Sequence, residues 1–220
     1  MNKKTAIVFG ATGLIGNLLL EELTRTESYS AIKSFVRQST GITEQKVEEI
    51  VADFSGSSSF LQLMSGDDIF ICLGTTIKKA GSVANMERID RDLPLDIARA
   101  AASAGVKGIA VVSSIGASAK TSNYYLRIKG EMEEGILQLP FERKAIVRPS
   151  MLLGERKEKR TAEMVGKVVM TAFKPVLIGK LMKYRAIHAR DVARAMIALM
   201  NRPQEKTIFE SDELQRLSGQ

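Results

Sequence analysis

Residues 5–25 read TAIVFGATGLIGNLLLEELTR, a short apolar run followed by a glycine turn and a longer apolar segment. The run TAIVFG (5–10) is rich in β-branched residues and is typical of a buried strand. Leucine and isoleucine then recur at the spacing of one helix face, at positions 14, 15, 18, 19 and 23. The stretch therefore predicts a strand, a tight turn and a helix.

Three glycines occupy the predicted turn with the spacing G-x-x-G-x-x-G, at positions 10, 13 and 16. Glycine lets the backbone turn tightly and approach a pyrophosphate, and the N–H groups that begin the helix face the anion. The alternative is a tight turn that only packs the helix closely on the strand. We expect a dinucleotide to bind here, with contacts from Gly10, Thr12, Gly13, Leu14 and Ile15.

The same alternation of strand and helix continues along the chain. Further strands are expected at 31–37, 47–54, 67–74, 108–116 and 144–150, with helices near 57–65, 83–103, 121–138 and 188–200. Strands that are almost continuously apolar are typical of a parallel sheet covered on both sides. We therefore predict an α/β fold, a Rossmann-type doubly wound parallel sheet with helices on both faces.

The composition predicts one domain over residues 1–220, because 220 residues with 45% hydrophobic content support one good core. A charge run at 155–160 and a mixed apolar and basic stretch mark a small substrate-covering segment, or lid, at about 151–187. Lys167, Lys174, Lys180 and Lys183 also suggest a membrane-surface helix, but Pro175 and Gly179 interrupt it and favour the lid.

The charge balance, 32 − 25 = +7, suggests an anionic partner. Nucleic acid is not expected, since no helix clusters basic residues and aromatic residues do not alternate with them. The apolar run at the N-terminus is too short for a signal peptide or a membrane span. The single cysteine, Cys72, excludes an intramolecular disulfide and is expected to be a buried thiol. These features predict a cytoplasmic protein without stable membrane insertion.

The residues after the second and third strands bear on the choice of cofactor. Arg37 ends the expected second strand, and no acidic residue follows it before Glu44. An arginine at this place accepts the 2′-phosphate of NADP(H), so NADP(H) is favoured over NAD(H); a solvated strand end is the alternative. Asp53 and Phe54 are placed to bracket an adenine, or else to form a turn and a core aromatic. Further cofactor contacts are expected from Leu73, Gly74 and Thr75, where the fourth strand ends.

The stretch NYYLRIKG (123–130) places Tyr125 four residues before Lys129, on one face of a predicted helix. A free phenol has a pKa near ~10, and a neighbouring ammonium favours its phenolate form. The pair is therefore a candidate general acid or base, although such a spacing is also common on surface helices. Ser113 and Ser114 end the fifth strand, where a hydroxyl can bind the oxygen that Tyr125 protonates.

These motifs together resemble the extended or atypical branch of the short-chain dehydrogenase/reductase family. GATGLIG, CLGTT, VVSSIGA, YLRIK, VRPSMLLG and IHARDVARA match its order and spacing from residue 5 to about 200. CLGTTIKKAGS, RIDRD, NYYLRIKGEME and RPSMLLGERKEKR are similar to the Tat-interacting-protein-like oxidoreductases. That subgroup binds NADP(H) and has reported roles in regulation as well as in redox chemistry.

The resemblance implies specific roles. Tyr125 would donate the proton, Lys129 would hold the nicotinamide ribose and favour the phenolate, and Ser114 would orient the substrate oxygen, with Ser113 as the fallback. Pro149 to Leu152 would lie beside the nicotinamide. Asp90, in IDRD, stands where many extended members carry asparagine. The resemblance therefore leaves open whether Asp90 joins Ser114, Tyr125 and Lys129 as a fourth member of the proton relay. The short substrate segment argues against a large sugar-nucleotide pocket.

The sequence thus predicts an NADP(H)-dependent oxidoreductase that transfers a hydride between nicotinamide and a small carbonyl or alcohol substrate, with no metal. The alternative is a protein that senses NADP(H) and contacts a protein partner with little or no turnover. Oligomeric state is left open, and His188 is expected to start a helix or lie at an interface. Several cations are placed to meet cofactor phosphates or an acidic substrate, or to be surface charges: Lys78, Lys79, Arg148, Arg156 and Arg160.

Overall fold

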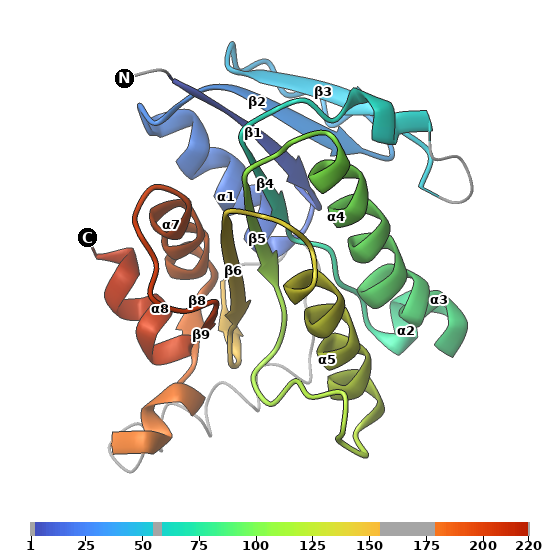
Figure 1. The fold of residues 1–220 in the computed structure, drawn as a ribbon, viewed down its shortest axis with the longest axis vertical. Helices are drawn as coiled ribbons and strands as arrows, with labels where there is room; N and C mark the ends of the chain where they lie inside the picture. The colour runs from blue at the N-terminus through green and yellow to red at the C-terminus, as the bar shows by residue number, and fades with distance from the viewer. Residues whose placement is uncertain (1–2, 55–58, 155–178, 220) are drawn as a thin grey trace.

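The computed structural model describes residues 3–54, 59–154 and 179–219, and these form a parallel sheet between two layers of helices (Figure 1). The seven strands are ordered β3-β2-β1-β4-β5-β6-β9, and every neighbouring pair is parallel. The predicted doubly wound sheet is confirmed. The strands are β1 (Lys4–Phe9), β2 (Tyr29–Val36), β3 (Val47–Val51), β4 (Asp68–Ile71), β5 (Gly108–Val112), β6 (Arg143–Arg148) and β9 (Ile208–Glu210).

Helices cover both faces of this sheet, with α1 and α7 on one side and α4 and α5 on the other (Figure 1). Successive residues of a strand point to opposite faces. In β1, Ala6 and Val8 enter the first core, and Ile7 and Phe9 enter the second. The helices are α1 (Leu14–Arg25), α2 (Ile77–Ala80), α3 (Val83–Glu87), α4 (Leu93–Ser103), α5 (Tyr124–Leu137), α7 (Ala189–Met200) and α8 (Ser211–Ser218), with η1 (Ser59–Leu63), η2 (Arg88–Asp92) and η3 (Gly179–Tyr184).

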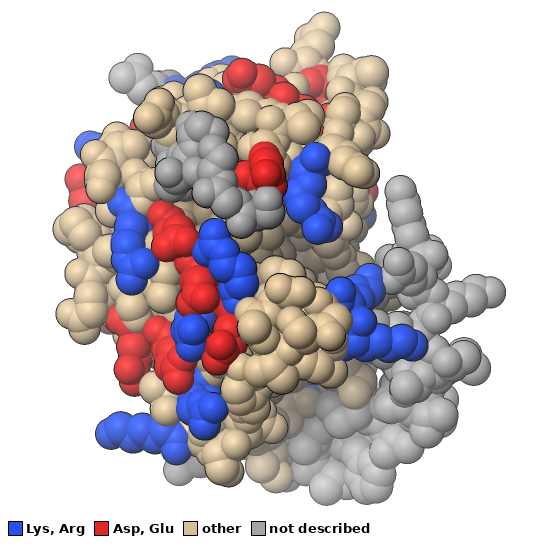
Figure 2. Space-filling model, turned by 90° about the vertical axis from the view of Figure 1, so that its right-hand side faces the viewer, with Lys and Arg blue, Asp and Glu red and all other residues tan. Residues whose placement is uncertain are grey.

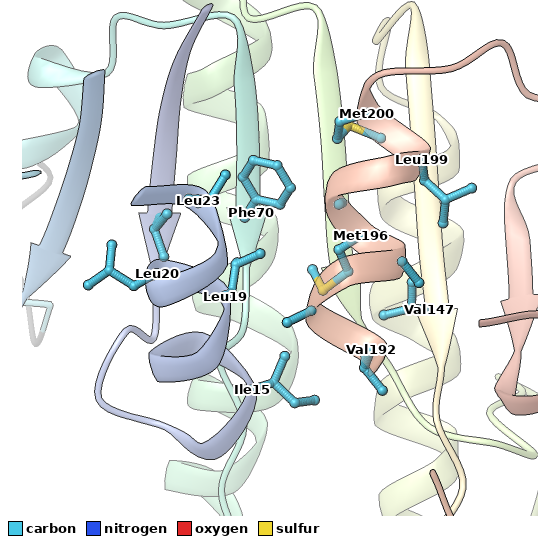
Figure 3. Close-up of a cluster of buried hydrophobic side chains, with 14 of the residues drawn as sticks. Ile15, Leu19, Leu20, Leu23, Phe70, Val147, Val192, Met196, Leu199 and Met200 are labelled. Carbon is cyan, nitrogen blue, oxygen red and sulfur yellow. The ribbon is translucent and has the colours of Figure 1, made fainter. Parts of the chain in front are cut away.

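The first core lies where α1 and α7 pack side by side on the sheet (Figure 3). Leu19 and Leu23 of α1 face Val192 and Met196 of α7 over Phe70 of β4, and all five side chains are completely buried. Burying an apolar side chain of this size contributes about 1.5–3 kcal/mol. This packing fixes α1, and therefore the glycine loop that precedes it, on the sheet.

The second core is aromatic where it approaches the carboxyl ends of β1 and β2. The rings of Phe9 and Phe35 stack with their centroids 4.7 Å apart. Phe60 of η1 and Phe54 lean on this stack, with Phe54 and Phe60 5.0 Å apart. The core aromatic role that was the alternative for Phe54 is therefore observed.

The predicted helices are found at 59–63, 83–103, 124–137 and 189–200, with the second one formed by α3, η2 and α4 in succession. Two elements beyond residue 200 were not expected, β9 and α8, and β9 adds a seventh strand beside β6. The predicted lid falls mostly outside the described residues, including Arg156 and Arg160. At its ends, β7 (Leu152–Leu153) pairs with β8 (Ile187–His188).

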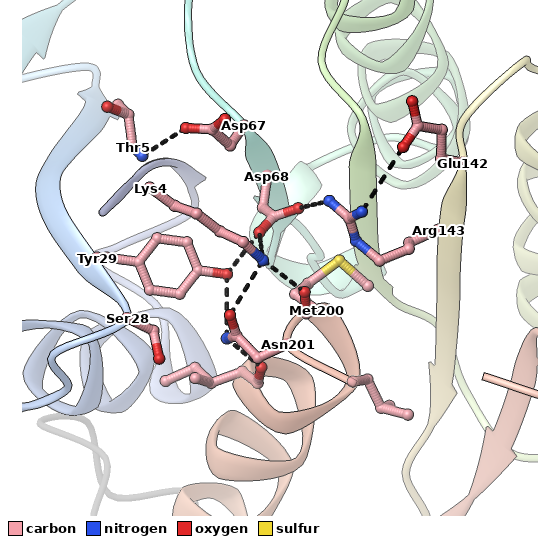
Figure 4. A network of polar contacts seen from close by, with 12 residues as sticks. Lys4, Thr5, Ser28, Tyr29, Asp67, Asp68, Glu142, Arg143, Met200 and Asn201 are labelled. Carbon is pink, nitrogen blue, oxygen red and sulfur yellow. Dashed lines mark hydrogen bonds and ion pairs between the residues drawn. The ribbon is translucent and has the colours of Figure 1, made fainter. Parts of the chain in front are cut away.

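The amino-terminal edge of the sheet is held together by one buried carboxylate, Asp68, the first residue of β4 (Figure 4). It accepts hydrogen bonds from Tyr29 Oη at 2.7 Å, Lys4 Nζ at 3.0 Å and an Arg143 guanidinium nitrogen at 2.9 Å. Gly108 makes room for it, since a Cβ there would lie 2.1 Å from Asp68 Oδ1. Burial, and then the negative charge of Asp68, raise the pKa of Tyr29, so this phenol stays a donor. Four strands are joined in this way.

We expect Asp68→Asn to lower the free energy of unfolding by about 3 kcal/mol, the low end for a broken buried ion pair. The new amide would turn N–H groups toward Lys4 or Arg143, which are donors themselves. Urea unfolding followed by circular dichroism measures the change. Asp96→Asn is the matched control, because Asp96 pairs with arginines at the surface, and its loss should cost about 0–1 kcal/mol. Equal losses in the two variants would contradict the role of Asp68.

Candidate functional site

The glycine loop between β1 and α1 is built on backbone contacts that leave no room for side chains. Gly10 has a φ of +84°, and a Cβ on it would lie 2.6 Å from the carbonyl oxygen of Cys72. A Cβ on Gly16 would lie 2.1 Å from the carbonyl oxygen of Gly10. Both distances are far inside van der Waals contact. The loop can therefore lie between the ends of β1 and β4 and the start of α1 only with glycine at these two positions.

The start of α1 has the features of an anion site. Its N-cap is Gly13, which has no side chain to occupy the first N–H groups, and its first turn holds no acidic residue. The N–H groups of Leu14 and Ile15 have no acceptor inside the helix, as in the first turn of any α-helix. They add to the positive end of the helix dipole. With Thr12 exposed beside them, these groups fit a phosphate or pyrophosphate.

Arg37 lies at the same edge of the sheet as the glycine loop, because β2 pairs in parallel with β1. It is the first residue after β2, and its side chain is exposed. Asp53 is also exposed, two residues after β3. Phe54 is half-buried and packs on Phe9 and Phe60, so its contact with an adenine stays a prediction.

The loop after β4 continues the same edge. Cys72 N–H donates to the carbonyl of Phe9 at 2.8 Å, which joins the ends of β4 and β1. Cys72 is partly buried against the first core, and desolvation raises the pKa of its thiol to about 12, so the expected buried thiol is observed only in part. Leu73 packs on the second core, and Gly74 is exposed. The N–H of Thr75 donates to Asp90 Oδ2 at 3.0 Å, so this loop is tied to η2.

Lys129 of α5 lies at the carboxyl end of β5. Its side chain is only 2% exposed, and its Nζ is 3.4 Å from the carbonyl oxygen of Val112, the last residue of that strand. The same Nζ forms an ion pair with Asp90 Oδ1 at 2.9 Å. Tyr125 lies one helical turn earlier and is half-buried. The predicted pair therefore belongs to one face of α5, and its lysine lies next to the serines that follow β5.

The loop that carries Ser114 is pressed against α5 and β6. A Cβ on Gly130 would lie 2.2 Å from the backbone of residues 118 and 119, so α5 and this loop touch backbone to backbone. Ser118 N–H donates to the carbonyl of Leu126 at 3.1 Å. Ile115 N–H donates to the carbonyl of Pro149 at 3.1 Å. These contacts bring the half-buried Ser114, the helix of Tyr125 and the buried Pro149 into adjoining elements.

Ser113 has a different role from Ser114. Its hydroxyl donates to the buried carboxylate of Glu133, which also pairs with the guanidinium of Arg148. Arg148 was a candidate for cofactor phosphates, and this carboxylate binds it instead. Glu133 was not singled out from the sequence, although it lies four residues after Lys129 and so on the same helix face. The binding of a substrate oxygen by Ser114 stays a prediction.

The remaining predicted residues lie around this edge. Leu152 belongs to β7 and packs with Leu14 on the first core. Lys78 and Lys79 are exposed on α2. His188 is exposed and occupies the N-cap of α7, as expected for a helix start. Within 3–54, 59–154 and 179–219, no group of three or more histidine, cysteine or acidic side chains is placed to hold a metal ion.

Comparison with known proteins agrees with this geometry. Residues 10–203 match the family described as NAD(P)H-binding. Protein FMP52, mitochondrial, of Eremothecium gossypii is 33% identical over 201 residues, which span 88% of this chain and 87% of the relative. Protein HTATIP2 of Rattus norvegicus is 34% identical over 171 residues, which span 76% of this chain and 70% of the relative.

Solved structures with low sequence identity share the fold. An ADP-L-glycero-D-manno-heptose-6-epimerase of Helicobacter pylori has a TM-score of 0.71 at 16% identity, over 96% of this chain and 80% of its own. MoeE5 in complex with UDP-glucose and NAD has a TM-score of 0.68 at 16% identity, over 98% and 81%. At such identities the likeness concerns the fold alone.

We expect Gly16→Ala to lower the free energy of unfolding by about 1–3 kcal/mol or more, because the added methyl overpacks the loop. NADPH binding should be lost or strongly weakened, since the backbone of Gly10 must move. Thermal unfolding and calorimetric titration measure the two effects. Gly219→Ala is the matched control: Gly219 has a φ of −89° and nothing within 4 Å of an added Cβ. A Gly16→Ala protein that binds NADPH normally would refute the close approach.

Proposed function

The chain belongs to the NAD(P)H-binding family, and from that membership we propose that it is an NADP(H)-dependent oxidoreductase acting on a small carbonyl or alcohol substrate. The observation that carries the proposal is the placement of Lys129. A buried ammonium lies at the end of β5, beside the serine loop, on the helix face that also carries Tyr125. A protein that only binds a dinucleotide has no need of this arrangement.

The residues of the chain fit the cofactor. The cradle formed by Gly10, Gly13 and the N-terminus of α1 suits a pyrophosphate, and a Cβ on Gly10 would clash with the Cys72 backbone that helps to shape it. Gly74 and Pro149 lie at the ends of β4 and β6, along the edge where open α/β sheets bind ligands. When bound, the nicotinamide supplies or accepts the hydride.

The proton chemistry belongs to the protein. In carbonyl reduction, the carbonyl carbon gains a hydride and its oxygen gains a proton from Tyr125 Oη, which leaves an alcohol and a tyrosine phenolate. The hydroxyl of Ser114 donates a hydrogen bond to the reacting oxygen. The ammonium of Lys129 stabilises the phenolate until a proton from solvent restores it. Oxidation of an alcohol uses the same groups in reverse.

The finer assignments are part of the same proposal. Arg37, exposed at the end of β2, is the residue that would select NADP(H) through the 2′-phosphate. Membership of the Tat-interacting-protein-like subgroup is supported by the likeness to Protein HTATIP2. In the described part of the chain no helix is long and apolar enough to cross a bilayer. A cytoplasmic location stays a prediction, and the fungal relatives carry the word mitochondrial in their names.

Calorimetric titration with NADPH and, separately, with NADH tests the cofactor assignment. We expect NADPH to bind more tightly than NADH. Arg37→Ala should weaken NADPH by about tenfold or more and leave NADH unchanged, because hydrogen bonds to charged groups contribute about 1.5–3 kcal/mol. Arg216→Ala, which removes an exposed arginine of α8, is the matched control. An unchanged preference in Arg37→Ala would refute the 2′-phosphate contact.

The role of Tyr125 is tested by Tyr125→Phe, which removes the hydroxyl and little else. Reductase activity, found by following NADPH oxidation over a panel of aldehydes and ketones, should fall by about 10²-fold or more, with cofactor affinity retained. Tyr124→Phe is the matched control, since Tyr124 is the preceding residue of α5. Burial and the neighbouring Glu87 raise the pKa of the Tyr124 phenol, which makes it a poorer proton donor. Equal activity in Tyr125→Phe and wild type would exclude proton transfer by this residue. Tight NADPH binding without turnover of any carbonyl would favour the cofactor-sensing alternative.

A further inference from the structure

The side chain of Asp90 connects three elements that carry the candidate site. It is completely buried in η2, between α3 and α4. One carboxylate oxygen lies 2.9 Å from Lys129 Nζ on α5, and the other accepts the N–H of Thr75 at 3.0 Å, in the loop after β4. A buried carboxylate is therefore the counterion of the lysine to which the proton chemistry is assigned.

The local helix geometry explains why this carboxylate points inward. Residues 88–92 form a turn of π-helix, and such turns insert one residue and redirect the side chains around it. Asp90 is completely buried in this turn, and its neighbours Ile89 and Arg91 are half-buried. Arg88 pairs with Asp96, and Arg91 pairs with Asp92 and Glu131. Acidic and basic side chains are intermixed over the side of the molecule where α4 and α5 lie (Figure 2).

We propose that Asp90 is a positioning residue that fixes Lys129 in the site and compensates its charge. This inference rests on the proposed function, and it assigns to Asp90 a part that a neutral asparagine at this place cannot take. With Asp90 ionised and Tyr125 protonated, the cluster of Asp90, Lys129 and Tyr125 is neutral, and loss of a proton makes it negative. Without the carboxylate the cluster starts at +1, and loss of a proton makes it neutral. The carboxylate therefore holds the proton in the cluster to higher pH.

The other charged groups packed around this cluster do not alter its charge balance. On α5, Glu133 is neutralised by Arg148 of β6. On α3 and η2, the acidic and basic groups pair with one another or with α4 and α5 at the surface. The thiol of Cys72, at the end of β4, is neutral because burial raises its pKa to about 12. The paired groups are Arg91 with Glu87, Asp92 and Glu131, Arg127 with Glu131, and Arg88 and Arg99 with Asp96.

The test is Asp90→Asn, which keeps the size of the side chain and an acceptor for Thr75 N–H but removes the charge. In the reductase direction the rate falls as pH rises and Tyr125 loses its proton. The variant should show this fall at a pH lower by about one unit or more. Asp92→Asn is the matched control, because Asp92 lies two residues away and pairs with Arg91 at the surface. An unshifted profile in Asp90→Asn would overturn the proposal.

A second readout does not depend on turnover. Tyrosine labelled with ¹³C at Cζ, and lysine labelled at Cε, report the protonation of Tyr125 and Lys129 by NMR. The chain has four tyrosines, and the Tyr125 signal is the one missing from Tyr125→Phe; Lys129→Gln assigns the lysine signal. The first of the two residues to lose its proton should do so at lower pH in Asp90→Asn than in wild type. If both signals titrate as in wild type, Asp90 has no such role, whether or not Tyr125→Phe is active.

The melting temperatures of the variants provide a third test. Removing one member of a buried ion pair leaves the other charge uncompensated, and removing both does not. If Asp90→Asn melts at a lower temperature than wild type or fails to fold, Asp90→Asn/Lys129→Gln should melt at a higher temperature than Asp90→Asn. A double variant that is no more stable than Asp90→Asn would show that Asp90 is required for packing rather than for charge, and would overturn the proposal.

Discussion

The absence of a Cβ at Gly10 and Gly16 is the constraint on which the site depends. Because neither residue has a side chain, the backbones of β1, β4 and α1 meet at one point, with Gly16 against the carbonyl of Gly10 and Gly10 against that of Cys72. The start of α1 is then held at the carboxyl edge of the sheet, where its first N–H groups have no acceptor inside the helix. Since the strands are parallel, the ends of β2, β4, β5 and β6 reach the same edge. Arg37, Gly74, Ser114 and Pro149 follow the ends of strands at one edge of the sheet for this reason.

Two buried carboxylates stand at opposite edges of this sheet, and their partners differ. Asp68, at the amino edge, is surrounded by two cations and a phenol, so its acceptor capacity is filled by the protein. Asp90, at the carboxyl edge, meets one cation and one N–H. An ammonium has three donors. Lys129 donates one hydrogen bond to the Val112 carbonyl and forms an ion pair with Asp90, so its ammonium keeps donor capacity for a ligand such as a ribose hydroxyl. The contacts of Asp68 therefore stabilise the amino edge of the sheet, whereas Lys129 at the carboxyl edge can still donate to a ligand.

The sequence was informative where a side chain acts within its own segment. The glycine spacing, the apolar strands and the four-residue step from Tyr125 to Lys129 each depend on a few neighbouring residues, and they predicted the sheet, its helices and the place of the pair on α5. Contacts between distant segments were not predictable in this way. The Lys129–Asp90 ion pair joins residues 39 positions apart, and the pairing of β9 with β6 joins residues about 60 apart. No local pattern encodes either, and a three-residue strand has too little periodicity to be seen before it pairs.

The inner face of α5 shows how enzyme and sensor use the same contacts. Tyr125, Lys129 and Glu133 occupy three successive turns, and the two charged members take their partners from η2 and β6. The Gly74–Thr75 loop is tied to Asp90, because Thr75 N–H donates to it, and Asp90 in turn pairs with Lys129. The loop after β4 and the helix that carries Tyr125 are thereby joined by two short contacts. In an enzyme, these contacts would set the charge beside the phenol of Tyr125. In a sensor, they would connect the cofactor site to α5. The link is the same in both, and the phenol of Tyr125 on the face of Lys129, for which a sensor has no need, is the feature that favours the enzyme.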